Sequence, residues 1–335
     1  MTEQPGSSAW LALHNESALD PDRPIIDPHH HLWRRNGSNY LLDDLWQDTQ
    51  TGHRIEKTVF IECHAEYRKE GAEHLKPLGE TEFVAAQAEK SEQNNQRATI
   101  AGIVGHVDLR LAAKIEPILN AHIELGGGRF RGIRHAGAHA THPEGMTIIG
   151  RAPEGLYEDE GYRTGLRLLG EMGMSFDTWH YHYQNTSFIN LAEACPGTTM
   201  ILDHFGTPLG VGAFANKRQT IFTTWQRDIE AIAKCGNVIA KLGGLAMPDN
   251  GFGWSERASP PSSDEFADLQ SPYYTHTIDC FGSERCMMES NFPVDKLSIS
   301  YGVLYNGLKK IAGTYGDAEQ HQLFYGTADK IYNLS

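Results

Sequence analysis

The feature that most limits the possible folds is a regular alternation of short apolar runs with longer amphipathic stretches. The stretches have the pattern of helices, as in "TSFINLAEAC" and "IFTTWQRDIEAIAKCG". We expect strands at 24–27, 58–63, 99–104, 130–134, 175–178, 199–203, 238–242 and 285–289. Roughly eight strand-then-helix units predict an α/β fold, a (β/α)8 or TIM barrel. A doubly wound sheet is the alternative, but no glycine-rich phosphate loop follows the first expected strand.

The chain has 335 residues, which is long for one ordinary domain but common for a single barrel. We expect an N-terminal extension over 1–23 and one barrel domain over 24–335. Two irregular segments, 138–159 and 247–263, directly follow expected strands and would lie at the catalytic face. They are interpreted as lids or interface arms, with tolerated surface insertions as the alternative.

Composition narrows the possible partners. Lys and Arg number 29 against 43 Asp and Glu, so the net charge is −14, and an acidic chain repels nucleic-acid phosphates. The first residues lack the pattern of a signal peptide, and no apolar run is long enough for a membrane span. The five scattered cysteines are typical of reduced thiols. We therefore expect a cytoplasmic protein with a small-molecule substrate, and a homodimer is plausible.

Histidines cluster behind several of the expected strands. In "PIIDPHHHLW", Asp27, His29 and His31 share one face by strand alternation, and the two imidazoles could bind one divalent ion. "SFDTWHYHYQ" adds His180 and His182, and "MILDHFG" adds His204. Because the carboxyl ends of barrel strands meet at one mouth, these distant histidines are expected to converge.

Together these segments resemble the amidohydrolase superfamily, and most closely its amidohydrolase-related branch, which includes sugar-lactone and pyrone-dicarboxylate lactonases. The resemblance is carried by "IIDPHHHLW", "RGIRH", "FDTWHYHYQ", "LDHFGTPLG", "KLGGL" and "CMMESNFPVDK". It implies that His29, His31 and His182 hold a divalent metal, zinc or manganese, with His180 as the neighbour of His182. His204 would be a further ligand or would contact the reacting group.

The sequence departs from this branch behind the eighth expected strand. Relatives carry an aspartate that binds metal and takes a proton, and Asn291 stands in its place. An amide oxygen can touch a metal but cannot act as a base. Three interpretations remain open. Glu289, Asp295 or His204 supplies the base; the site works without metal; or hydrolysis has been lost.

Other residues are expected to bind the substrate. Arg134 ends the fourth expected strand and could clamp a carboxylate or a lactone carbonyl through its planar fork. His64 could contact the substrate or move a proton, and Tyr181 could line an aromatic pocket. The leading hypothesis is a hydrolase that opens a lactone of a small carboxylic or sugar acid. The alternatives are an isomerase or decarboxylase of a related acid, and a ligand-binding barrel without catalysis.

Overall fold

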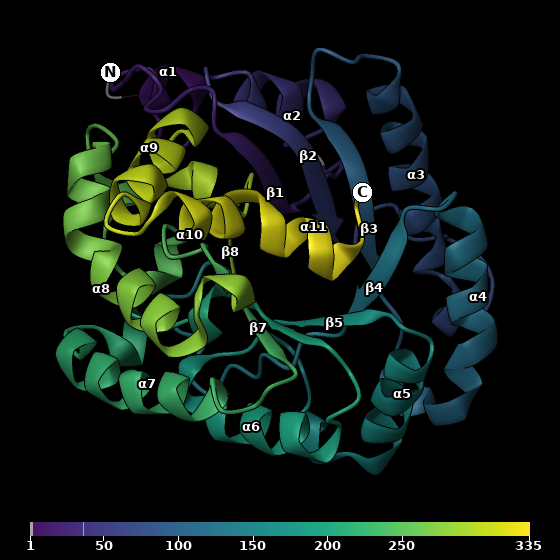
Figure 1. Ribbon diagram of the computed structural model, residues 1–335. Helices are drawn as coiled ribbons and strands as arrows, with labels where there is room; N and C mark the ends of the chain where they lie inside the picture. The colour runs from purple at the N-terminus through teal and green to yellow at the C-terminus, as the bar shows by residue number, and fades with distance from the viewer. Residues whose placement is uncertain (1–2, 36) are drawn as a thin grey trace.

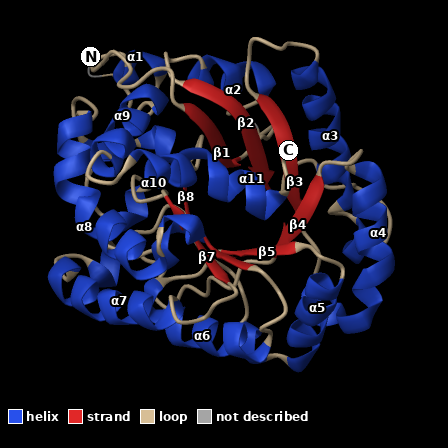
Figure 2. Ribbon diagram, viewed as in Figure 1, coloured by secondary structure: helices blue, strands red, loops and turns tan. Residues whose placement is uncertain are grey.

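The computed structural model describes residues 3–35 and 37–335. Eight parallel strands pair in chain order from β1 to β8, which confirms the predicted barrel. Beyond β8 the ring is closed by two hydrogen bonds, from the Asn291 N–H to the His29 carbonyl (3.0 Å) and from the His31 N–H to the Phe292 carbonyl (2.8 Å). Figure 2 shows the strands as a central ring with helices around it. The strands are β1 Pro24–His30, β2 Arg54–Ile61, β3 Thr99–Gly105, β4 Phe130–Arg134, β5 Ser175–Thr178, β6 Met200–Leu202, β7 Val238–Leu242 and β8 Cys286–Met288.

The helices lie outside the strands and bury their apolar faces against them (Figure 1). They are α1 Ser8–Leu11, α2 Leu42–Thr49, α3 Leu78–Glu92, α4 Glu116–Leu125, α5 Glu160–Glu171, α6 Asn185–Ala194, α7 Arg218–Ile232, α8 Ser263–Phe281, α9 Tyr301–Ala312, α10 Asp317–His321 and α11 Thr327–Tyr332. Among the described residues, no helix combines the length and the apolar character that a bilayer crossing requires.

Several strand boundaries differ from the predicted ones. β6 and β8 are shorter than expected, because the chain leaves the extended conformation at Asp203 and after Met288. β2 begins earlier and ends at Ile61, and β1 continues to His30. The residues that extend past β2, β6 and β8 include most of the candidate site, where backbone turns rather than strand alternation set the side-chain directions.

The C-terminal segment closes the barrel at the end opposite the strand carboxyl ends. Tyr332 and Leu334 pack with Ile26, Val59 and Ile239 in one apolar cluster inside the barrel. Figure 1 shows α11 lying across this opening, with the C-terminus beside it. The remaining mouth, at the carboxyl ends of the strands, is where active sites of such barrels are built.

The long segment between β4 and α5 is held in place by hydrogen bonds to two other segments, the one after β5 and the one after β7. Its Gly150 N–H donates to the Tyr181 hydroxyl (2.7 Å), which donates to the Ile148 carbonyl (3.1 Å). Asp249, from the segment after β7, accepts from the N–H groups of Thr147 (2.6 Å) and Ile148 (2.8 Å). This segment, residues 135–159, is called the β4 arm below.

Candidate active site

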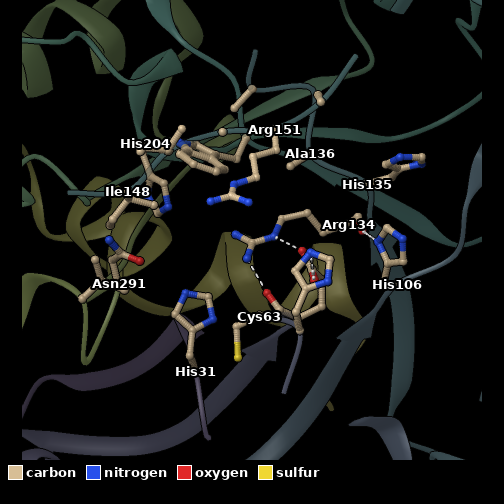
Figure 3. Close-up of a pocket in the computed structure, with 18 of the residues that line it drawn as sticks. His31, Cys63, His106, Arg134, His135, Ala136, Ile148, Arg151, His204 and Asn291 are labelled. Carbon is tan, nitrogen blue, oxygen red and sulfur yellow. Dashed lines mark hydrogen bonds and ion pairs between the residues drawn. The ribbon is translucent and has the colours of Figure 1, made fainter. Parts of the chain in front are cut away.

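A cavity of about 550 Å³ opens at the carboxyl ends of the strands (Figure 3). Its wall takes residues from nearly every strand end and from the β4 arm. They include His31, Trp33, Glu62, His64, His106, Arg134, His135, Ile148, Arg151, Trp179, His204, Met247 and Asn291. Sequence elements far apart in the chain therefore meet at one mouth, as the barrel topology requires.

Below the cavity, two imidazoles share one carboxylate. His204 Nδ1 lies 2.6 Å from Glu289 Oε1, and His29 Nδ1 lies 2.7 Å from Glu289 Oε2. Because each Nδ1 faces the carboxylate, the opposite nitrogen, Nε2, is left for other partners. His204 lines the cavity, so its Nε2 is the atom available there.

A buried lysine, Lys241, lies between His29 and the acidic side chains inside the barrel. Lys241 Nζ lies 2.6 Å from Asp177 Oδ1, 3.5 Å from Asp203 Oδ1 and 3.4 Å from His29 Nδ1. Tyr332, from the C-terminal helix, donates to the same Asp177 oxygen at 2.7 Å. Burial alone would lower the pKa of Lys241, but the surrounding carboxylates, Asp177 first, raise it above its ordinary value. The ammonium therefore stays charged and balances the acidic groups.

Burial also sets the protonation states of His29, His204 and Glu289. It lowers the pKa of His204 to about 3 and that of His29 well below the ordinary value, so both rings are neutral near pH 7. It raises the pKa of Glu289 to about 8, against the opposing effect of Lys241. A carboxyl with a raised pKa, in contact with two imidazoles, can share a proton with either ring. Near pH 7 the trio therefore keeps its exchangeable proton on or beside Glu289.

The backbone around His204 has an uncommon conformation. His204, Phe205, Gly206 and Thr207 all have positive φ, between 43° and 66°, which is costly for residues with a Cβ. The neighbouring Gly243–Gly244 pair leaves room for the site: a Cβ on Gly244 would lie 2.4 Å from His204 Nδ1, and one on Gly243 would lie 2.4 Å from the Glu289 side chain. The "KLGGL" segment thus lets both side chains approach β7 closely.

Two further side chains at the cavity floor have fixed orientations. His31 Nδ1 lies 2.8 Å from the Ile61 carbonyl, so this nitrogen carries the proton and Nε2 keeps its lone pair. Asn291 Nδ2 donates to Asp295 Oδ1 (2.9 Å), and Figure 3 shows the amide oxygen turned towards the cavity. Asp295 itself is fully enclosed below Asn291 and also accepts from the Ala246 N–H (3.2 Å).

Arg134 is the main cation of the cavity wall. Its Nε donates to Glu62 Oε1 (2.9 Å), its second terminal nitrogen donates to the Glu62 carbonyl, and its first lies 3.5 Å from Asp203 Oδ2. The guanidinium is thereby held with its plane fixed, and Figure 3 shows it at the centre of the pocket. It can offer its remaining N–H groups to an oxygen of a bound molecule.

The structure brings some of the predicted residues together and separates others. His31, His64, Arg134, His204 and Asn291 line the cavity, while His29 and Glu289 lie directly beneath His204.

The predicted residues behind β5 lie away from the cavity wall. His180 is buried and hydrogen-bonded to Asn185 (3.1 Å). His182 Nδ1 accepts from the Leu209 N–H (3.3 Å), and its ring packs against Phe214. Tyr181 holds the β4 arm, as described above. The turn after Thr178 redirects all three side chains, so the alternation assumed for a continuing strand does not apply there.

Asp27 also differs from the expectation. The pairing of β1 with β2 is irregular between Asp27 and His30, and Asp27 accepts hydrogen bonds from Ser290 (2.6 Å) and Tyr301 (2.9 Å). These hydrogen bonds link the chain after β8 to Tyr301 of α9 through the Asp27 carboxylate.

Sequence reasoning gave no role to three residues that the structure places at the site. Lys241 lies within "KLGGL", where an alternating strand pattern would have placed it inside the barrel. His106 directly follows β3, and its Nδ1 lies 2.9 Å from the Arg134 carbonyl. Arg151 lies in the irregular β4 arm, where no periodic pattern could indicate its direction.

The donors beneath the cavity form a possible metal site. One ligand atom each from His29, His204 and Glu289 lie within 4.8 Å of one another, and all three residues are buried. His29 Nε2 is also buried and has no hydrogen-bond partner among the described residues. Imidazole and carboxylate are ligands that zinc accepts, so these residues fit a divalent ion. The group shares His29 with the predicted set of His29, His31 and His182, and it includes His204, which the resemblance offered as a further ligand.

Comparison with known proteins supports the fold and the family. An L-fucono-1,5-lactonase of Burkholderia multivorans is 24% identical over 320 residues, which cover 92% of this chain and 96% of that protein. The uncharacterized protein y4mH of Sinorhizobium fredii is 29% identical over 327 residues, covering 93% and 99%. A crystal structure of a Burkholderia multivorans amidohydrolase with bound zinc superimposes with a TM-score of 0.71 at 21% identity, covering 93% of this chain and 99% of that one. A family model described as Amidohydrolase matches residues 26–334, so this chain belongs to the amidohydrolase family of hydrolases.

Proposed function

We propose that the protein hydrolyses a lactone, the cyclic ester of a small hydroxy acid. The observation that carries this proposal is the pairing of His204 with Glu289 at 2.6 Å beneath a cavity whose centre holds the Arg134 guanidinium. A base beside a fixed cation is the arrangement that attack of water on an ester carbonyl needs. The 24% identical L-fucono-1,5-lactonase supports the substrate class.

Each residue would have its own role in the reaction. A water that donates one hydrogen bond to Asn291 Oδ1 gives its other proton to His204 Nε2 as its oxygen bonds to the lactone carbonyl carbon. Glu289 Oε1 accepts the hydrogen bond from His204 Nδ1 and so leaves Nε2 free to take the proton, and Arg134 donates to the carbonyl oxygen as charge develops there. The ring C–O bond then breaks, and His204 returns its proton to the leaving alkoxide. The products balance as lactone plus water giving one hydroxy acid.

A screen of lactones tests this function directly. Opening each lactone releases one proton near neutral pH, because the new carboxylic acid ionises. We expect at least one five- or six-membered lactone to be opened with saturation kinetics, measured as base consumed at constant pH. If no lactone in a broad panel is consumed faster than in buffer, the proposal is wrong.

As an alternative arrangement of the same site, we propose that His29, His204 and Glu289 hold a divalent ion, zinc or manganese, with His31 beside them, in which case His204 would be a ligand and not the base. Such an ion would polarise the carbonyl and lower the pKa of bound water. His29→Ala/His31→Ala is expected to lose metal and activity together. The check is plasma mass spectrometry on wild type and variant purified without chelator, with His74→Ala as an exposed control. Equal metal content in wild type and variant would contradict this assignment.

A further inference from the structure

The cavity wall is strongly cationic, although the whole chain is acidic. Arg35, Arg110, Arg134 and Arg151 all line it, against the single carboxylate of Glu62 among the described lining residues. The chain as a whole carries a net charge of −14. A local reversal of charge inside a cavity raises the concentration of anionic ligands there.

These four arginines differ in the partners that their side chains already have within the protein. Arg134 is paired with Glu62 and Asp203, and Arg110 pairs with Asp108 at 2.6 Å. Arg35 stacks over Trp33 at 4.3 Å and donates to the Cys63 carbonyl. The Arg151 side chain has neither an ion pair nor a hydrogen bond within residues 3–35 and 37–335. Figure 3 shows its guanidinium pointing into the pocket, next to that of Arg134.

Arg151 is well positioned despite lying in a long loop segment. It forms a β-bridge with His139, and the flanking backbone is held by the Ala152 N–H bond to the Ala138 carbonyl (2.9 Å). One residue before it, Gly150 is fixed by Tyr181 (2.7 Å). These bonds fix the backbone of Arg151, and from there its exposed side chain reaches into the pocket.

We infer that the substrate is an acidic lactone, and that Arg151 binds a carboxylate carried on its ring or side chain. The inference rests on the proposed function, because it names the substrate class for the same cavity. A guanidinium fork matches a carboxylate with two parallel hydrogen bonds, and Arg134 beside it adds to the attraction. Because Arg134 is already paired with Glu62 and Asp203, Arg151 is the guanidinium whose charge a carboxylate of the substrate would neutralise.

The test compares lactones in matched pairs that differ only in CH2OH or COO⁻, such as D-glucono-1,4-lactone and D-glucaro-1,4-lactone. The wild type should favour the acidic member, and Arg151→Gln should lower its kcat/KM by about 10- to 100-fold, mainly through KM. The neutral member should change by less than about twofold. Arg151→Lys should recover part of the loss, because it keeps the charge but not the fork. Arg167→Gln, on the exposed side of α5, is the matched control.

Binding without turnover separates this inference from the proposed function. Calorimetric titration with succinate, glutarate and citrate, against neutral 1,5-pentanediol, reads the anion site alone. At least one acid should bind the wild type about tenfold more tightly than Arg151→Gln, with Arg167→Gln unchanged. Acid binding that depends on Arg151 without any lactone turnover would refute the lactonase but support the anion site. Equal acid binding in wild type and Arg151→Gln, no acid binding at all, or preference for neutral lactones would overturn the inference.

Discussion

His204→Asn is expected to lower kcat/KM for the lactone by roughly a hundred- to ten-thousandfold, the usual contribution of a general base. The substitution removes the Nε2 atom that faces the cavity, and with it the acceptor for the proton of the attacking water. Asparagine is chosen because it tolerates positive φ better than other residues, and His204 has a φ of 54°. The backbone after β6 should therefore keep its course, and the loss should report chemistry rather than misfolding.

Two control measurements distinguish a loss of catalysis from a loss of folding. The midpoint of thermal unfolding for His204→Asn should stay close to that of the wild type, and the exposed His74→Asn variant should keep full activity. If His204→Asn hydrolysed the lactone at the wild-type rate, His204 could not be the general base. The base would then have to be sought in His31 or Glu289.

Lys241→Met is expected to destabilise the fold by about 3–5 kcal/mol, because it leaves buried carboxylates without their cation. Lys241 is fully buried, with Asp177 at 2.6 Å and Asp203 at 3.5 Å. Methionine fills a similar volume, so the loss would come from charge rather than from a cavity. Denaturant unfolding, followed by circular dichroism, measures the change.

The double variant Lys241→Met/Asp177→Asn is the matched control, since it removes one negative charge together with the positive one. It should be more stable than Lys241→Met alone, because fewer uncompensated charges remain in the barrel. A Lys241→Met variant as stable as the wild type would show that the buried network does not depend on its ammonium.

The sequence predicted the barrel well, because its strands are buried on both sides and appear as short apolar runs. It also predicted that the histidines behind β1, β5 and β6 converge, and the structure brings those behind β1 and β6 together but not His180 and His182. The directions of single side chains were harder. His204 and Asn291 lie in positive-φ turns, and His180 and His182 follow a strand that ends at Thr178.

The contacts between distant elements could not be read from the sequence. Tyr332 reaches Asp177 across 155 positions, and Glu289 reaches His204 across 85. Arg151 lies in a segment whose course depends on Tyr181 and Asp249, two residues from other loops. Periodicity describes one element at a time, so such partners appear only when the fold brings them together.

The most direct test of lactone hydrolysis at this site is turnover of an accepted lactone in ¹⁸O-labelled water, with His204→Asn run in parallel. Mass spectrometry of the product should show one ¹⁸O atom in the new carboxylate, formed at the enzymatic rate by the wild type and at a strongly reduced rate by the variant. Product formed by the wild type without the label would mean isomerisation or decarboxylation instead of hydrolysis, and would contradict the account.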